Sequence, residues 1–224
     1  MTIQGPAKFN DEQFELLAIP NYVRLNRGGR TIVWISNIKI VIPEPGTGLI
    51  WSGGPYTLDG IDDYISLPVD ILTNCSDFTI ATWVKLDTRR QWARIFDVGT
   101  DTTTNMFLTE EASTGNIRFA VTIGGSGAEE QINGSSPVAT GSWQHVAVTL
   151  SQTEGKLYVN GSLMGSNTIH ISPYLLGHTN HNYIGKSQYN DPYLDGQIDD
   201  FRIYNYALSS DDIKALAELR SYAE

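Results

Sequence analysis

The sequence predicts an all-β fold, a sandwich or a barrel, on three observations. Short runs of Val, Ile, Thr, Phe, Tyr and Trp recur along most of the chain, often in the alternating pattern of half-buried strands. The 21 Gly and 9 Pro residues interrupt these runs at close intervals, as turns between antiparallel strands require. A helical period is convincing only near the C-terminus. With 224 residues, 41% of them hydrophobic, the chain can bury the core of one large β domain.

Residues 1–46 differ from the rest and are expected to form an N-terminal β arm. Two β-like runs, FELLAIPNYVRLN and TIVWISNIKIVIP, flank a Gly-Gly pair at 28–29, which predicts a hairpin. Because an isolated hairpin is not stable in water, the arm must either add a pair of strands to the main domain or dock on another chain. In the docking alternative the contact residues are Trp34, Ile38, Ile40 and Ile42.

The main domain is expected to span 47–224 and to consist of strands in close succession. The strongest pattern is GSWQHVAVTL at 141–150, where Val146, Val148 and Leu150 alternate with His145, Ala147 and Thr149. Further strands are predicted at 78–86, 92–99, 105–109, 116–123, 182–187 and 195–208.

Two local signals predict a hairpin and a helix. In KLYVNGSLMG, the Asn160-Gly161 pair is the preferred centre of a type I′ turn, and the short arms predict a peripheral ribbon. A helix is predicted from about Ser210 to about Tyr222, with Ser209 as N-cap and Asp212 in the position of a capping box.

Two acidic segments are expected to meet in space. LDGIDDYISL contains Asp59, Asp62 and Asp63, and DGQIDDFRIYNYAL contains Asp199 and Asp200 at the start of a predicted strand. Carboxylates in such positions need solvent, a cation or hydrogen-bond donors, because burying them unpaired is costly.

Six segments, LDGIDDYISL, DFTIATWVKL, GSWQHVAVTL, GKLYVNGSLMG, YIGKS and DGQIDDFRIYNYALSSDDIKAL, together resemble the laminin G-like modules of the concanavalin A-like jelly-roll superfamily. The resemblance covers about residues 49–220. It implies a jelly roll of two packed antiparallel sheets, with the first and last strands of the module side by side. Many relatives hold a structural Ca²⁺ where the two acidic segments would then meet, and Ca²⁺ prefers such oxygen ligands. Asp side chains that cap their own turns are the alternative.

Enzymes of this superfamily carry a strand with Glu-x-Asp-x-x-Glu or a close variant, which supplies the two carboxyls of a glycosidase. The nearest segment here, 197–201, has Gln197 and Phe201 where outer acids would belong. We therefore expect no enzymatic activity.

Two loops, at 89–94 and 188–193, have the composition of a carbohydrate site, with aromatic rings for stacking and polar groups for hydrogen bonds. Alternatively, their Trp and Tyr residues brace the loops, and the two histidines are simply solvated. The candidate ligand-binding residues are Arg90, Trp92, His178, His181, Tyr189, Asn190 and Tyr193.

The net charge of −10 argues against nucleic acid or an anionic membrane as the main partner. Expected partners are another protein bound through the arm, a surface glycan, or both, and a homo-oligomer stays open.

The preferred hypothesis is a non-catalytic structural or display protein of a surface assembly such as a virus particle. The alternative is a carbohydrate-binding module of a secreted glycan-degrading protein. No signal peptide is recognisable, so we expect a virion or the cell exterior, reached without a leader or as part of a larger secreted chain.

Overall fold

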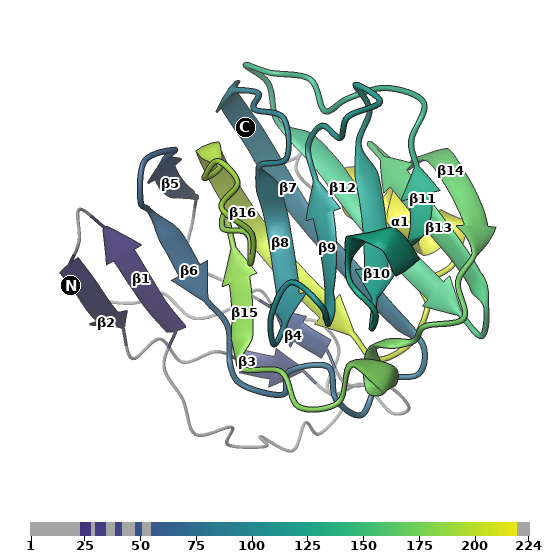
Figure 1. Ribbon diagram of the computed structural model, residues 1–224. Helices are drawn as coiled ribbons and strands as arrows, with labels where there is room; N and C mark the ends of the chain where they lie inside the picture. Colours follow the sequence, from purple (N-terminus) through teal and green to yellow (C-terminus); the bar gives the residue numbers. More distant parts are fainter. Residues whose placement is uncertain (1–22, 28–29, 35–38, 42–47, 51–54, 219–224) are drawn as a thin grey trace.

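The computed structural model describes residues 23–27, 30–34, 39–41, 48–50 and 55–218, the first four ranges by their backbone only. Two antiparallel sheets pack face to face (Figure 1). The first sheet contains β1 (Val23–Arg27), β2 (Arg30–Trp34), β6 (Tyr64–Ser66), β8 (Arg94–Gly99), β9 (Asn105–Thr109), β10 (Arg118–Thr122), β11 (Glu130–Asn133) and β15 (His181–Ile184). The second contains β3 (Lys39–Val41), β4 (Gly48–Ile50), β5 (Tyr56–Asp59), β7 (Phe78–Thr88), β12 (Gln144–Ser151), β13 (Glu154–Val159), β14 (Ser162–Thr168) and β16 (Asp195–Tyr204).

The strand order is β11-β10-β9-β8-β15-β6-β1-β2 in the first sheet and β14-β13-β12-β7-β16-β4-β3 in the second, where β5 also pairs with β16. The predicted all-β sandwich is therefore confirmed. The last strand of the sandwich, β16, lies in the middle of its sheet, between β7 and the two strands β4 and β5.

The core lies between the two sheets and follows from the alternation of side chains along the strands. The Phe78 ring on β7 lies 6.0 Å from that of Phe119 on β10. The Phe96 ring on β8 lies 6.3 Å from that of Phe201 on β16. Each of these fully buried side chains contributes about 1.5–3 kcal/mol relative to exposure. The contacts join one sheet to the other, so they position the outer faces as well.

A helix covers part of the outer face of the second sheet. In α1 (Ser210–Glu218), Ile213 packs against Ala81, Ala147 and Tyr158. Ala81 and Ala147 are paired across β7 and β12, and their small side chains leave room for the helix. Figure 1 shows α1 behind the second sheet.

The predicted capping box is confirmed. The Ser209 N–H donates to Asp212 Oδ2 at 3.1 Å, and the Asp212 N–H donates to Ser209 Oγ at 3.2 Å. The helix is described to Glu218, and the predicted extension to residue 222 lies outside the described residues. The predicted hairpin is also present between β13 and β14, with positive φ at Asn160 and Gly161 (50° and 75°). Its outer strand, β14, is an edge of the second sheet.

The strands of the N-terminal arm extend both sheets. β1 and β2 form the predicted hairpin, with Arg27 opposite Arg30, and β1 pairs with β6. β3 pairs with β4, which pairs with β16. Of the proposed docking residues, Trp34 lies in β2 and Ile40 in β3, whereas Ile38 and Ile42 lie outside the described residues. The boundary after residue 46 and the docking role stay predictions.

Two short helical turns, Ser126–Ala128 and Pro173–Leu176, were not predicted. In the described part of the chain, no helix is long and apolar enough to cross a membrane.

Candidate functional site

The outer face of the first sheet carries large aromatic and charged side chains. Met106 and Leu108 of β9 face the core, so the intervening Phe107 faces outward. By the same alternation, Phe119 and Val121 of β10 belong to the core. The large outward side chains of β10, β15 and β6 are Arg118, Tyr183 and Tyr64.

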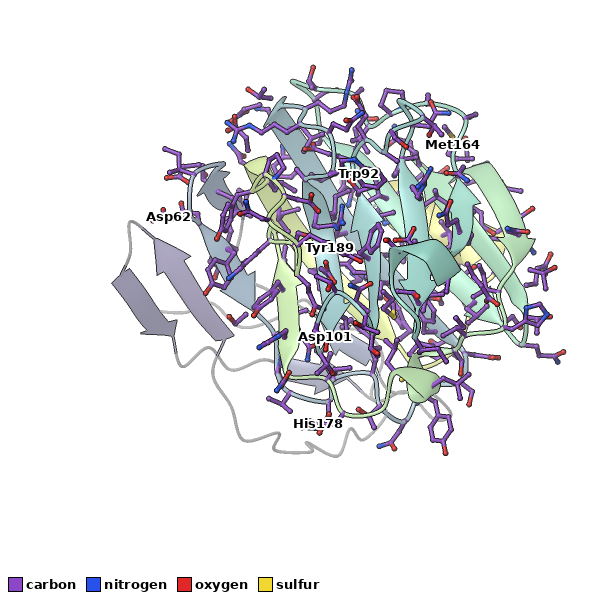
Figure 2. All side chains as sticks on the ribbon, in the orientation of Figure 1. Asp62, Trp92, Asp101, Met164, His178 and Tyr189 are labelled. Carbon is purple, nitrogen blue, oxygen red and sulfur yellow. The ribbon has the colours of Figure 1, made fainter. Side chains whose placement is uncertain are left out.

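A cluster of rings and guanidinium groups lies over β8, β9 and β10. The Arg94 Cζ atom is 3.9 Å from the centroid of Phe107, 5.6 Å from that of Trp92 and 6.0 Å from that of Tyr189. The Arg118 Cζ atom is 5.4 Å from the Trp92 ring. Figure 2 shows Trp92 and Tyr189 in front of the first sheet. We call these five residues, Trp92, Arg94, Phe107, Arg118 and Tyr189, the Trp92 patch.

Arg94 is the buried centre of this patch, with 2% of its surface exposed. Its Nη2 lies 3.0 Å from Asp191 Oδ2, its Nε lies 3.6 Å from Asp97 Oδ2, and its Nη1 donates to the Trp92 carbonyl at 2.7 Å. Burial lowers the pKa of Arg94 and raises the pKa of Asp97 to about 6, while the attraction between them opposes both shifts. Removing Arg94 would leave Asp97 buried without its cation, whereas removing Asp97 would leave Arg94 paired with Asp191 alone.

The loop at 185–194 holds Tyr189 over the sheet. The backbone N–H and the side-chain amide of Gln188 each donate to Asp97 at 3.1 Å. Ser187 Oγ donates to Asp191 Oδ2 at 2.9 Å, and the Tyr189 hydroxyl donates to the Thr102 carbonyl at 2.7 Å. These bonds fix the ring before any ligand arrives.

Trp92 has a φ of 69°, in the left-handed region that a bulky residue rarely adopts. Such a conformation costs about 1–3 kcal/mol and persists only when neighbouring groups impose it. The Trp92 N–H donates to the Glu111 carbonyl at 2.8 Å, and the Ala93 N–H donates to the Arg90 carbonyl at 3.0 Å. Residues under such constraint gather at functional sites, which singles out Trp92.

Glu110 precedes Glu111, whose carbonyl accepts a hydrogen bond from the Trp92 N–H, and its side chain is fully buried. Its Oε1 accepts a hydrogen bond from the Arg90 N–H at 3.0 Å. Burial raises the pKa of Glu110 to about 8, so the carboxyl is mostly protonated at neutral pH.

A second cluster lies over the neighbouring strands β15 and β6. The Lys186 Nζ is 4.2 Å from the centroid of Tyr64 and 4.8 Å from that of Tyr183. The Tyr193 ring lies 6.2 Å from Tyr64, and His181 stacks on Tyr183 at 6.0 Å. We call Tyr64, Tyr183, Lys186 and Tyr193 the Lys186 patch.

The structure brings together some of the predicted ligand-binding residues and separates others. Trp92 and Tyr189 belong to the Trp92 patch, Tyr193 to the Lys186 patch, and His181 lies beside the latter. Asn190 is exposed in the loop that carries Tyr189.

Two predicted ligand-binding residues have other partners. Arg90 turns toward the acidic loop, where its guanidinium donates to the Gly60 carbonyl and lies 3.2 Å from Asp195 Oδ2. His178 pairs with Asp70 at 2.8 Å and lies at the far end of the sheet from Trp92 in Figure 2.

The acidic loop gathers three of the five predicted metal ligands. One ligand oxygen from each of Asp59, Asp62 and Asp63 lies within 4.8 Å of the others. Asp59 Oδ1 accepts hydrogen bonds from the N–H groups of Ile61 at 2.9 Å and Asp62 at 3.3 Å, which lower the pKa of Asp59. The turn-capping alternative therefore applies to Asp59.

The two acidic segments meet as predicted, because β5 pairs with β16, but Asp199 and Asp200 do not join this loop. The residue of β16 opposite Asp59 is Asp195, and Asp199 lies four residues farther along, about 13 Å. Asp200 sits in a β-bulge with a φ of 49° and pairs with Arg202 at 2.7 Å.

The donor set of the acidic loop fits a hard cation in chemical type. Three carboxylates supply oxygen ligands, whereas Ca²⁺ takes about six to eight. The Gly60 carbonyl is already bonded to Arg90, and that guanidinium is a positive charge beside the loop. A cation bound here would therefore need further oxygens from water or a ligand.

Several residues of the two patches were not predicted as site residues, among them Phe107, Arg118 and Lys186. Only strand alternation could have found Phe107, as an aromatic residue between two core positions. The buried pair of Arg94 and Asp97 depends on a register shift between Arg94 and Phe96, which no local pattern indicates.

Comparison with family models matches residues 59–214 to a family described as the concanavalin A-like lectin/glucanases superfamily. The comparison with curated proteins gives no match.

Solved structures with the same fold include domain 4 of AbnA, an extracellular GH43 arabinanase from Geobacillus stearothermophilus, in complex with arabinotriose. It is 22% identical, with a TM-score of 0.65, covering 89% of this chain and 91% of that one. The IT-sialidase CBM40 of Ruminococcus gnavus, bound to α2,3-sialyllactose, is 15% identical, with a TM-score of 0.56 and coverages of 65% and 85%. Trypanosoma rangeli sialidase is 16% identical, with a TM-score of 0.58 and coverages of 89% and 32%. At these identities the likeness concerns the fold.

Proposed function

Because the chain belongs to the concanavalin A-like lectin/glucanases superfamily, we propose that it is a non-catalytic carbohydrate-binding module. The glycan binds on the outer face of the first sheet, over the Trp92 patch. The observation that carries this proposal is Trp92 itself, half-buried and held in a left-handed backbone conformation. Sugar rings stack on aromatic faces, and the guanidinium of Arg118 lies beside the indole as a hydrogen-bond donor.

The comparisons favour this function over the preferred sequence hypothesis of a virus-particle protein. Two of the similar structures hold arabinotriose and sialyllactose, and none of the three structures compared is described as part of a virus. We accordingly propose a glycan as the partner and the cell exterior as the place of action. A protein partner for the N-terminal arm stays a prediction.

The carboxylates of this face support a binding role rather than catalysis. A glycosidase needs two carboxyls that can reach one glycosidic bond. Asp97 is buried and bonded to Gln188, and Asp191 is paired with Arg94 and Ser187. Glu129, which interacts with Arg94 and Arg118, accepts a hydrogen bond from the Gln131 side-chain amide at 2.8 Å, so all three carboxylates have partners within the protein.

A structural Ca²⁺ at the acidic loop is a separate proposal, with Asp59, Asp62 and Asp63 as its ligands. Ligand binding to the native state raises its stability by mass action, about 2.7 kcal/mol at a concentration 100 times Kd. Calcium should therefore raise the Tm of the wild type relative to EDTA. Asp62→Ala should lose this response, and Asp199→Ala should keep it. Equal Tm values of the wild type in calcium and EDTA would contradict the proposal.

A glycan array followed by titration calorimetry tests the binding function. Trp92→Ala should weaken binding of the best glycan by about 10- to 100-fold, as expected for an aromatic anchor. Trp143→Ala, another half-buried tryptophan outside the patch, is the matched control. Tyr189→Ala should also weaken binding, and near-UV circular dichroism checks that the variants stay folded. A wild-type protein that binds no glycan on the array would overturn the proposal.

A further inference from the structure

Lys186 is an isolated cation in an aromatic surrounding. Among residues 55–218, whose side chains the structure describes, its ammonium forms no ion pair or hydrogen bond, and it lies over the rings of Tyr64 and Tyr183. Arg89, Arg90, Arg94 and Arg202, by contrast, each pair with a carboxylate.

The chemistry of this arrangement favours an anionic ligand. An ammonium has three N–H donors, and contacts with ring faces leave these donors free to bond to oxygen atoms. Half-burial penalises the charged lysine and lowers its pKa. A ligand that brings a negative charge would offset that penalty, whereas a neutral hydroxyl would do so only weakly.

The Lys186 patch is also continuous with the Trp92 patch. The same loop supplies Lys186 to one and Tyr189 to the other, three residues apart. The strands beneath follow the order β9-β8-β15-β6. Three strand spacings are about 15 Å, so one oligosaccharide can lie across both patches.

From these observations, and resting on the proposed carbohydrate-binding function, we propose that the ligand is an acidic glycan. A sugar residue that bears a carboxylate or a sulfate ester binds Lys186 between Tyr64 and Tyr183, while a neighbouring sugar stacks on Trp92. Lys186 therefore determines specificity, and the Trp92 patch supplies affinity that does not depend on the charge.

The test compares glycans that differ only in the anionic group. The array contains lactose, 3′-sialyllactose and 3′-sulfolactose, together with oligogalacturonates and their methyl esters. The full chain should bind a charged form at least 10-fold more tightly than its neutral counterpart. Lys186→Met should reduce this preference by about 10- to 100-fold, and Lys186→Arg should retain most of it.

Lys85→Met is the matched control. It removes the same charge from β7 in the second sheet, and the preference should stay unchanged. Near-UV circular dichroism confirms that Tyr64 and Tyr183 keep their surroundings in Lys186→Met. The carboxylated and sulfated probes show which anion the patch takes.

Four results would overturn this inference. Equal affinity for charged and neutral forms, or an equal loss for both in Lys186→Met, would refute the role of Lys186 and leave the binding function standing. If Lys85→Met lost the preference for charged glycans to the same extent, that preference would come from the overall charge of the protein and not from Lys186. Binding to no glycan would refute the proposed function together with the inference.

Discussion

The outer faces of the two sheets differ in what lies on them. On the second sheet, two alanines lie beneath α1, and Ile213 is buried completely against them. On the first sheet, large rings and charges occupy the corresponding face, and the described residues place no α-helix over it. Small outward residues let the chain cover its own sheet, whereas bulky polar ones keep a face available to another molecule. The comparison therefore links one face to stability and supports the proposed binding on the other.

The largest expected effect comes from the buried charge of the first face. Arg94→Met should destabilise the fold by about 3–5 kcal/mol, because it leaves Asp97 buried without its cation. It should also release Trp92 and Tyr189 and abolish glycan binding. Urea unfolding and calorimetry measure the two effects. Arg94→Lys should recover part of the stability but less of the binding, since lysine lacks the planar fork. Wild-type stability in Arg94→Met would show that the pair is not structural.

A somewhat smaller effect is expected under α1. Ile213→Ala should cost about 2–4 kcal/mol through the cavity it leaves, without changing glycan affinity. Ile61→Ala, at a position that is 73% exposed, should change neither quantity and serves as control. A folded Ile213→Ala protein that has lost glycan binding would show that the two faces are coupled.

The smallest effect is an opposite pH dependence of two buried groups, Glu110 and His145. The pKa of Glu110 is raised to about 8, so its contribution to stability is present at low pH and is lost as pH rises from about 5 to about 8. His145, on the second sheet, has its pKa lowered to about 4 by burial, so stability is lost as pH falls from about 6.5 to about 4.

Thermal unfolding from pH 4 to pH 9 tests this contrast. Glu110→Gln should remove the loss of folding stability above pH 5. The expected gain in the free energy of unfolding is at least about 1 kcal/mol, or about 2–4 °C in Tm. His145→Gln should leave that loss in place and flatten the acid side. A profile that Glu110→Gln does not change would mean that this carboxyl titrates normally.

The fold was largely predictable because its signals are local. Alternation in 78–86 and 141–150 predicted β7 and β12, Asn160-Gly161 predicted the turn, and Ser209 with Asp212 predicted the start of α1. Each depends on residues close in sequence, so no knowledge of the partner strand was needed.

The site was predicted only in part because it depends on register. Trp92 and Tyr189 stood out by composition, but their meeting requires Arg94 and Phe107 from paired strands. The strand was correctly predicted to begin at Asp195, but Asp199 and Asp200 were expected beside the acidic loop and lie farther along the strand. The bulge at Asp200 redirects that acid toward Arg202, and a bulge leaves no clear local signal.

The central place of β16 has a consequence for how the molecule is made. Thr82 and Asp199 are joined by a hydrogen bond across 117 residues of sequence, and β16 fills the gap between β7 and β4. Contacts so distant along the chain slow folding to milliseconds or seconds. On the ribosome, the second sheet stays split until Asp195–Tyr204 has emerged, and until then β7 exposes an open edge. A growing chain is therefore open to wrong strand pairing until β16 has been made.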